Sequence, residues 1–365
     1  MPRLVCVLGQ LEILMARDLY LNPVGLLYGT TAREAAGVGS AGWLAGGDIG
    51  FCAVEVWQNM PGTIARDLRS YRALKSSNET AVVEALHLLE NKRSSAFKAD
   101  QSGPLIMGVV NVTPDSFSDG GDFLDHKAAI AHGHALVAAG VDILDIGGES
   151  TRPGAEPISM GEELNRILPV VKGLRSLSRP LSIDTRKPEV MRQAADSGAG
   201  IINDVSALTF DENSVEVVRD LDRPVILMHA QGDPRCMQDN PAYENVVPEV
   251  FNWLAQRLAM AEVAGIKRAN LLVDPGIGFG KNLKHNLELL ANLTFFHGLG
   301  VPVVLGASRK RFIGELTGTP DARQRVPGSI AAALKAAASG IQIVRVHDVA
   351  ETRQALTVAE TIQAI

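Results

Sequence analysis

Cysteine, aromatic residues and an excess of positive charge are all scarce in this chain. Its 365 residues include only three cysteines, Cys6, Cys52 and Cys236, and these lack the paired spacing of zinc ligands. We therefore expect reduced packing residues in a cytoplasmic protein, and neither a disulfide framework nor a zinc site. The net charge of −6 argues against a polyanion-binding surface, so we expect no nucleic-acid partner, although a local basic pocket is compatible with it.

Long apolar runs are also missing. No stretch approaches the ~18 uninterrupted apolar residues of a membrane span, so we expect no membrane partner. The opening sequence MPRLVCVLGQLEILMA is only weakly similar to a signal peptide, because Gln10 and Glu12 interrupt its apolar run. The segment GIGFGK (276–281) lacks the length and the Lys-Ser/Thr ending of a P-loop. We interpret it as a glycine-rich loop that lets the backbone approach a ligand.

The composition of the chain changes near residue 95. Residues 1–72 contain short β-like runs between glycine-rich turns, and residues 79–93 place apolar residues at helical spacing. We predict a small α+β unit over 1–95, in which we identify no functional site. It is expected to pack against the rest of the chain or a partner subunit, and one option is the N-terminal opening of a barrel. The polar segment 94–104, SSAFKADQSGP, is the best linker candidate.

Residues 104–365 repeat one pattern, in which a short β-branched run is followed by a longer amphipathic segment. The eight runs are LIMGVV, VDILDIGG, PLSID, GIIND, PVILMH, NLLVDP, VPVVLG and IQIVRV. Such strands, joined by helices, predict a parallel sheet that is buried on both faces. A doubly wound open sheet uses the same units, but eight regular repeats favour a closed (β/α)8 barrel of the TIM type.

Polar residues follow every predicted strand. In a (β/α)8 barrel the strand ends converge on one face, where the site lies. Any one of these residues could simply cap the following helix, but polar ends in register on all eight strands favour a small-molecule site. In chain order the residues are Asn111, Asp145, Glu149, Thr151, Arg152, Asp184, Asn203, Asp204, His229, Asp274, Ser308, Arg309, Lys310, Arg345 and His347.

The chemistry of these side chains indicates a substrate with two different ends. Cationic donors suit phosphate oxygens, and they come from Arg152, Arg309, Lys310, Arg345 and His347. Acceptors that suit the N–H groups of a 2-aminopyrimidinone ring come from Asp145, Asp184, Asn203 and Asp274. We therefore expect a phosphate at one end of the substrate and a nitrogen-rich ring at the other.

The motifs that carry these residues resemble those of the dihydropteroate synthases. They follow one another in order across 104–365: MGVVNVTPDSFSDGG (107–121), DIGGESTRPGA (145–155), SIDTRKP (182–188), INDVSAL (202–208), MHAQGDPRCMQ (228–238), DPGIGFGK (274–281), GASRKRFIG (306–314) and RVHDV (345–349). The first 95 residues depart from the family, whose members have only a short strand or hairpin before the first motif.

The resemblance implies a barrel transferase of folate biosynthesis and a target of sulfonamides. It would join 4-aminobenzoate to 6-hydroxymethyl-7,8-dihydropterin diphosphate and release dihydropteroate and diphosphate, assisted by Mg²⁺. The resemblance also implies a homodimer formed through late helices. The pterin would be held by Asp184, Asn203, Asp274 and Lys310, with Met228 and Phe279 packing nearby.

The other end of the substrate falls, by the same resemblance, on the first, second and eighth loops. The diphosphate and Mg²⁺ would meet Asn111, Arg345 and His347, with Thr151 and Arg152 close by. The arylamine pocket would contain Phe117, Pro153 and Ser308. We assign catalytic roles to Asp184, Lys310, Arg345 and His347, and choose Asp184 as the fixed negative charge beside a developing pterin cation.

Two alternative functions remain open on the sequence alone. A pterin-dependent methyltransferase would share the ring-holding positions but would not need Phe117, Pro153 or the RVHDV segment. A non-catalytic pterin-binding relative would be expected to lack one or more of Asn111, Arg345 and His347, and all three are present.

Overall fold

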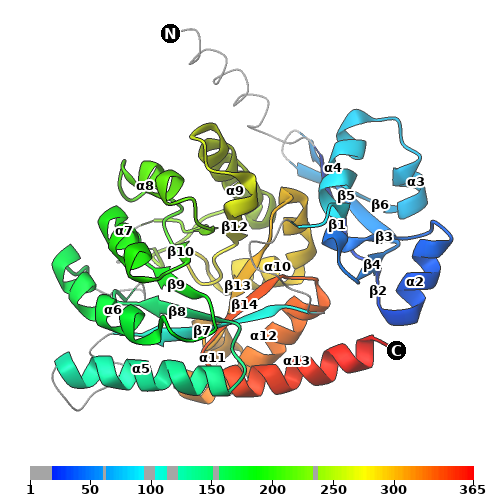
Figure 1. Ribbon diagram of the computed structural model, residues 1–365. Helices are drawn as coiled ribbons and strands as arrows, with labels where there is room; N and C mark the ends of the chain where they lie inside the picture. The colour runs from blue at the N-terminus through cyan, green and yellow to red at the C-terminus, as the bar shows by residue number, and fades with distance from the viewer. Residues whose placement is uncertain (1–18, 61–62, 94–102, 113–121, 151–155, 233–236) are drawn as a thin grey trace, which may run out of the picture.

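We describe the fold from a computed structural model of the 365-residue chain. The structure describes residues 19–60, 63–93, 103–112, 122–150, 156–232 and 237–365. Within these ranges the chain forms a parallel barrel with a smaller antiparallel unit beside it (Figure 1). The predicted fold class, a (β/α)8 barrel preceded by an α+β unit, is therefore confirmed.

The barrel is one sheet of eight parallel strands. Neighbouring strands follow one another around the barrel in the order β12-β11-β10-β9-β8-β7-β14-β13, and a parallel bridge between Val273 and Val303 joins the first and last of them. The strands are β7 (Leu105–Asn111), β8 (Ile143–Gly147), β9 (Leu181–Asp184), β10 (Ile201–Asp204), β11 (Val225–Met228), β12 (Leu271–Asp274), β13 (Val304–Gly306) and β14 (Ile343–Val346). Closure brings β14 next to β7, so the last loops lie beside the first.

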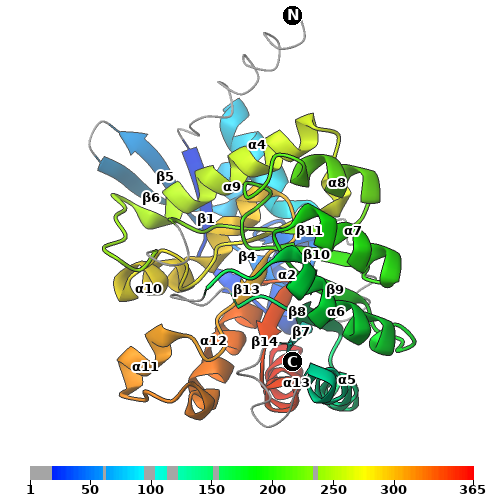
Figure 2. The same cartoon turned by 90° about the vertical axis from the view of Figure 1, so that its left-hand side faces the viewer.

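Helices cover the outside of the barrel, and in Figure 2 α5 to α8 form an arc around their strands. The helices are α5 (Asp122–Ala138), α6 (Met160–Leu174), α7 (Pro188–Ser197), α8 (Ser214–Leu221), α9 (Val246–Val263), α10 (Leu283–Ala291), α11 (Arg311–Thr317), α12 (Val326–Ala338) and α13 (Val349–Gln363), with 3-10 turns η3 (Arg268–Asn270), η4 (Leu293–Leu299) and η5 (Ala322–Gln324). Local signals start several of them: Ser159 caps α6, Pro188 opens α7, and Asn282 and His285 form a capping box on α10. Among the helices that the structure describes, none is long and apolar enough to cross a membrane.

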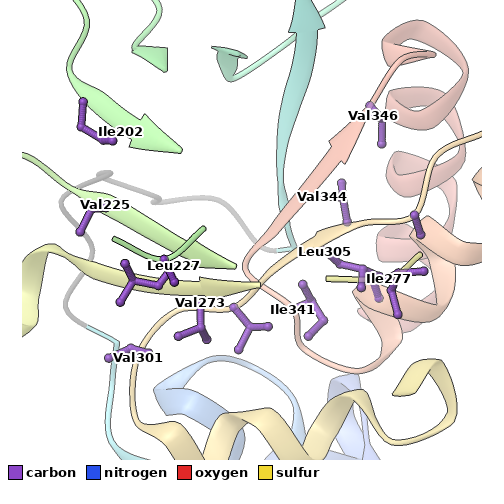
Figure 3. Packing of buried hydrophobic residues seen from close by; sticks show 14 of the residues in the cluster. Ile202, Val225, Leu227, Val273, Ile277, Val301, Leu305, Ile341, Val344 and Val346 are labelled. Carbon is purple, nitrogen blue, oxygen red and sulfur yellow. The ribbon is translucent and has the colours of Figure 1, made fainter. Parts of the chain in front are cut away.

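The alternation of inward- and outward-facing side chains along the strands determines which residues face the barrel interior. The barrel interior is filled near the start of the strands by apolar side chains such as Leu105, Ile143 and Ile343, all buried. Their neighbours in sequence point outward into the layer under the helices, part of which, including Leu227 and Val344, is drawn in Figure 3. Because side chains alternate with a period of two, the next inward positions after Ile143 and Ile343 are Asp145 and Arg345.

The N-terminal unit has its own small core. It contains the antiparallel sheet β1-β5-β6 and the smaller sheet β2-β4-β3, with buried residues such as Leu21, Val56 and Leu86. Its elements are β1 (Leu19–Pro23), β2 (Leu26–Leu27), α2 (Gly29–Gly37), β3 (Gly42–Trp43), η1 (Leu44–Gly46), β4 (Gly50–Phe51), β5 (Ala53–Met60), β6 (Thr63–Ser70), α3 (Tyr71–Lys75) and α4 (Thr80–Glu90). The sequence pattern predicts α4 but misses α2, because α2 contains no apolar residue larger than alanine and buries only Ala32.

The opposite face of the β1-β5-β6 sheet packs on the barrel. The Tyr20 ring lies 5.2 Å from that of Phe295 and 5.5 Å from that of Phe251, and the Trp57 ring lies 4.9 Å from Phe295. Arg93 donates a 2.7 Å hydrogen bond to the His297 carbonyl oxygen. Phe295 and His297 belong to η4, which leads into β13, so the unit covers the N-terminal end of the barrel strands, opposite the strand ends that carry the site.

Candidate functional site

Arg345 is the centre of the polar cluster at the mouth of the barrel. From β14, its Nε donates to Asp145 Oδ2 at 2.6 Å and its Nη2 donates to Asp184 Oδ2 at 2.8 Å. Asn203 Nδ2 donates to the same Asp145 oxygen at 3.1 Å. The guanidinium of Arg345, the carboxylates of Asp145 and Asp184 and the amide of Asn203 thus join four strands, β8, β9, β10 and β14.

Two carboxylate oxygens at this cluster lack a donor. Asp145 Oδ1 and Asp184 Oδ1 are buried and have no hydrogen-bond partner among the described residues. Leaving a buried acceptor unpaired costs ~1–3 kcal/mol, which the fold tolerates only where packing or function compensates. The unpaired oxygen of Asp184 and that of Asp145 are therefore candidate acceptors for the N–H groups of a bound ring.

Burial shifts the pKa values of the charged groups in this cluster. It raises the pKa of Asp184 to about 7, against the opposing effect of the Arg345 charge and with a contribution from the Asp145 charge. Burial also raises the pKa of Asp274, which the Lys310 charge and the Gly276 N–H oppose. The pKa of Lys310 falls to about 8, again chiefly because of burial, while the charge of Asp274 raises it.

A second wall of the site is built by the ends of β11, β12 and β13. Asp274 Oδ1 accepts the Gly276 N–H at 2.7 Å. Met228 on β11 lies opposite Asp274 in the register of β11 and β12. Lys310 donates to the Ile277 carbonyl oxygen, and its Nζ lies 4.7 Å from the centre of the Phe279 ring. This wall combines an apolar surface from Met228 and Phe279 with a carboxylate and an ammonium group, as a flat heteroaromatic ring requires.

The space between the two walls is left open by a glycine. A Cβ built on Gly306 would lie 3.6 Å from Asp274 Oδ2, 3.8 Å from Lys310 Nζ and 3.9 Å from the Arg345 Cβ. Any side chain at position 306 would therefore fill the centre of the cluster. The ring-holding residues predicted from the sequence, namely Asp184, Asn203, Met228, Asp274, Phe279 and Lys310, are all brought to this one cup.

Asn111 and His347 lie at the side where β7 meets β14. A Cβ built on Gly147 would lie 3.8 Å from Asn111 Oδ1 and 3.8 Å from Asp184 Oδ2, so these two oxygens face a common space. His347 hydrogen-bonds to Ser308 Oγ twice, through its backbone N–H at 3.2 Å and through Nδ1 at 3.1 Å. Ser308, predicted for the arylamine pocket, thus also orients the His347 ring.

Several predictions fall elsewhere. Phe117, Thr151, Arg152 and Pro153 lie outside the described residues. Arg309, considered as a phosphate donor, instead turns its guanidinium to Asp348, with a 3.0 Å hydrogen bond from Nε to Oδ2. Arg309 thus has a buried carboxylate partner, Asp348, and the cationic substrate contact expected of Arg309 stays a prediction. Cys52 is a free, half-buried thiol, and the other two cysteines lie outside the described ranges.

Two contributions were not identified from the sequence. Asp145 stood among the polar strand ends, but only the structure shows it as the shared acceptor for Arg345 and Asn203. Lys281 is almost fully buried and contacts His229, and the signal for it was a lysine directly after a glycine-rich turn at the end of a buried strand. Since such a turn is usually solvated, its lysine is ordinarily assigned to the surface.

Comparison with known proteins places this site in a known family. The family described as pterin binding enzyme matches residues 107–347. The dihydropteroate synthase of Escherichia coli K12 is 47% identical over 262 residues, which cover 72% of this chain and 92% of that protein.

Solved structures agree with the sequence matches. The Xanthomonas albilineans dihydropteroate synthase with 4-aminobenzoic acid is 53% identical, with a TM-score of 0.69, covering 72% of this chain and 94% of the other. The Yersinia pestis dihydropteroate synthase in a sulfonamide drug complex is 43% identical, with a TM-score of 0.69 and coverages of 72% and 96%.

Proposed function

The chain belongs to the pterin-binding enzymes, as a dihydropteroate synthase, and from this premise we propose how its own residues perform the reaction. It condenses 4-aminobenzoate with 6-hydroxymethyl-7,8-dihydropterin diphosphate to give 7,8-dihydropteroate and diphosphate. The relatives named dihydropteroate synthase, about 47% identical, support this function over the methyltransferase and the non-catalytic binder that the sequence left open. The observation that carries the mechanism is the Arg345 guanidinium between Asp145 and Asp184, with one unpaired carboxylate oxygen on each side.

We assign the pterin ring to the cup between the two walls. The unpaired Asp184 oxygen and the Asp274 carboxylate accept its N–H groups, while Asn203 and Lys310 donate to its ring nitrogen and carbonyl oxygen. Met228 and Phe279 pack on its faces. The negative charge of Asp184 then lies close to the exocyclic methylene.

The leaving group is assigned to the side of the site that contains Arg345 and His347. Arg345 uses two of its five N–H groups on carboxylates, which leaves donors for diphosphate oxygens. The His347 ring is oriented by Ser308 toward the same end. We propose that Thr151 and Arg152 of the second loop add further donors, and that Phe117, Pro153 and Ser308 receive the arylamine.

The oxygen donors at the end of β7 suit a Mg²⁺ ion that binds together with the substrate better than one held by protein ligands alone. In the described part of the chain, no three His, Cys, Asp or Glu side chains converge as a metal site. Asn111 offers one amide oxygen beside Asp184, and Mg²⁺ characteristically combines few protein oxygens with phosphate oxygens and water. We therefore propose that Asn111 would hold Mg²⁺ together with the diphosphate, where the ion would supply a counter-charge to the leaving group.

The reaction then needs little acid–base chemistry. The bond between the methylene carbon and the diphosphate oxygen breaks, and the electron pair leaves with diphosphate. The conjugated pterin carries the positive charge, which Asp184 stabilises. The neutral amine of 4-aminobenzoate forms the new C–N bond and loses one proton to solvent or to diphosphate.

The test of this function is a turnover assay. We expect the purified protein to release one diphosphate and form one dihydropteroate for each 4-aminobenzoate consumed. Chelation of Mg²⁺ is expected to lower the rate at least about tenfold, because the leaving group then loses its counter-charge. Pterin diphosphate consumption without dihydropteroate would contradict the assignment, and an unchanged rate after chelation would remove Mg²⁺ from it.

We expect His347→Ala to weaken binding of pterin diphosphate about tenfold, the value of one lost charge-assisted hydrogen bond. Binding of the bare 6-hydroxymethyl-7,8-dihydropterin should change less than about twofold, because His347 lies at the leaving-group side of the site. Calorimetry with both ligands measures the difference. The matched control is Ser308→Ala, which removes the hydroxyl that orients the ring and should give a smaller effect of the same kind. Equal losses for both ligands would place His347 at the ring instead.

The pH dependence of kcat/KM for pterin diphosphate should be bell-shaped and narrow. Asp184 acts as the anion, so the rate rises with pH as it loses its proton through a pKa of about 7. Lys310 acts as the cation, so the rate falls as it loses its proton through a pKa of about 8. A pH series with Asp184→Asn is the control, because this variant shares every ionisation of the substrate but loses the acidic limb that belongs to Asp184. An acidic limb that persists in Asp184→Asn would assign it to another group.

Other properties are proposed from family membership. The sulfonamide complex of the Yersinia pestis relative supports sulfonamide binding at the arylamine pocket here. Exposed Val358 and Ile362 on α13 support association of two copies through the late helices, as a homodimer in the cytoplasm.

A further inference from the structure

Lys281 is a buried lysine without a carboxylate partner among the described residues. Only 2% of its surface is exposed. Its Nζ contacts His229 Nδ1 at 2.8 Å and donates to the carbonyl oxygens of Phe279 at 2.9 Å and His229 at 3.4 Å. Burial, with the nearby Lys310 charge, lowers the pKa of Lys281 well below its usual range. A lysine in this environment is costly, so a simple packing role would be better served by leucine or methionine.

His229 is the acceptor that Lys281 requires. Burial and the Lys281 charge lower the pKa of His229 to about 2, so the imidazole stays neutral. In the tautomer that carries the ring proton on Nε2, Nδ1 is the acceptor for the Lys281 ammonium. The ring is fixed edge-on against Trp253, with centroids 4.9 Å apart, and the backbone N–H donates to the Asp274 carbonyl oxygen at 2.9 Å.

The pair joins the end of β11 to the glycine-rich loop 275–281 after β12. Gly276 has a φ of +68°, and a Cβ there would overlap the His229 carbonyl oxygen, so the loop backbone lies directly on the β11 end. Further side chains also hold it: Tyr243 Oη donates to the Gly280 carbonyl oxygen at 2.9 Å, Asn286 Oδ1 accepts the Gly278 N–H at 2.7 Å, and Gln238 Nε2 donates to the Gly278 carbonyl oxygen. Among these side chains, only Lys281 bonds both to His229, directly after β11, and to Phe279 in the loop.

Two groups of the pterin cup depend on this loop. Phe279 supplies an aromatic face, and the Ile277 carbonyl oxygen receives the ammonium of Lys310. A loop displaced by a fraction of an ångström would move both groups away from the ring while leaving Arg345 and Asn111 in place. The diphosphate and arylamine ends are assigned to other loops, so the effect is confined to the pterin.

We propose that Lys281, through its hydrogen bonds to His229 and Phe279, is a positioning residue that sets the pterin affinity of the site. The identity of the ligand in this proposal rests on the proposed function. The attachment of loop 275–281 to the end of β11 does not, because it is given by the hydrogen bonds of Lys281. Neither Lys281 nor His229 is assigned a contact with the substrate. Their contribution is the fixed placement of Phe279 and Lys310.

The experiment uses the full chain with Lys281→Met, which keeps the aliphatic stem, and the pair His229→Asn and His229→Leu. The Asn side chain keeps an acceptor at the position of Nδ1, and Leu does not. Hydrogen exchange of the amides 276–280 is measured without ligand, and KM for each substrate is measured with kcat. Leu258→Ala, a cavity on α9, is the control for lost stability alone.

We expect Lys281→Met and His229→Leu to speed exchange in 276–280 and to raise KM for pterin diphosphate about tenfold, a loss of about 1.4 kcal/mol. KM for 4-aminobenzoate should change less than about twofold, with kcat nearly retained. His229→Asn should behave like the unmodified protein. If Lys281→Met does not fold, the two His229 variants decide the question.

The proposal would be overturned if these variants had a lower melting temperature but neither faster exchange in 276–280 nor a higher KM for pterin diphosphate. That is the result expected of Leu258→Ala. So would equal increases in KM for both substrates. If the unmodified protein shows no turnover, the proposed function fails, while the exchange comparison still decides whether Lys281 holds the loop.

Discussion

Asp184→Asn should lower turnover about a hundredfold while weakening pterin diphosphate binding less than about tenfold. The asparagine Oδ1 can still accept the 2.8 Å hydrogen bond from Arg345, so the geometry of the cluster is retained. What is lost is the negative charge, which stabilises the pterin cation only after diphosphate has begun to leave. Single-turnover rates and pterin diphosphate affinities, measured on the same preparations, separate the two effects.

The matched control is Asp204→Asn on the neighbouring strand β10. Asp204 is also fully buried, but its oxygens accept the N–H groups of Ser206 and Leu208 instead of facing the barrel interior. This variant should lose stability and keep its turnover per folded molecule. If Asp184→Asn instead binds weakly and turns over normally, Asp184 is a ring-holding group and the cation is stabilised elsewhere.

A chain that starts near Gln101 should keep its turnover per folded molecule and lose roughly 10 °C in melting temperature. Removal of the N-terminal unit strips Tyr20 and Trp57 from the barrel and exposes Phe251 and Phe295 to water. Each buried phenylalanine is worth about 1.5–3 kcal/mol, and each kcal/mol shifts the midpoint by about 2–4 °C in a domain of this size. Calorimetry and the turnover assay measure both quantities.

Trp57→Ala in the full chain is the milder variant, and Leu68→Ala on the exposed strand β6 is its control. Leu68 is 66% exposed and Trp57 1% exposed, so only Trp57→Ala should lower the melting temperature markedly. Activity is expected to survive in both, because Trp57 packs on η4 at the end of the barrel opposite to the site. A folded truncation with intact stability and no activity would mean that the N-terminal unit reaches the site.

The local patterns of the chain predicted the barrel well. Each strand is a short apolar run and each helix an amphipathic one, and these periodicities depend on neighbours two to four residues apart. Each of the eight predicted apolar runs coincides with one strand of the barrel, from LIMGVV at β7 to IQIVRV at β14. Helix α2 was missed because it is mostly exposed and its apolar residues are all alanines.

The sequence by itself determined the fold, the family and the set of polar residues at the strand ends, since the strand–helix repeat, the period of two and the motifs are all local. Only the tertiary structure decided which of these residues pair. Arg345 meets Asp145 from 200 residues away, Arg309 turns to Asp348, and Lys281 finds His229. It also decided which face of β1 meets the barrel, because both faces of this strand are buried and its local sequence does not distinguish their partners. These choices depend on how the closed barrel buries and compensates charge, which is a property of the whole fold.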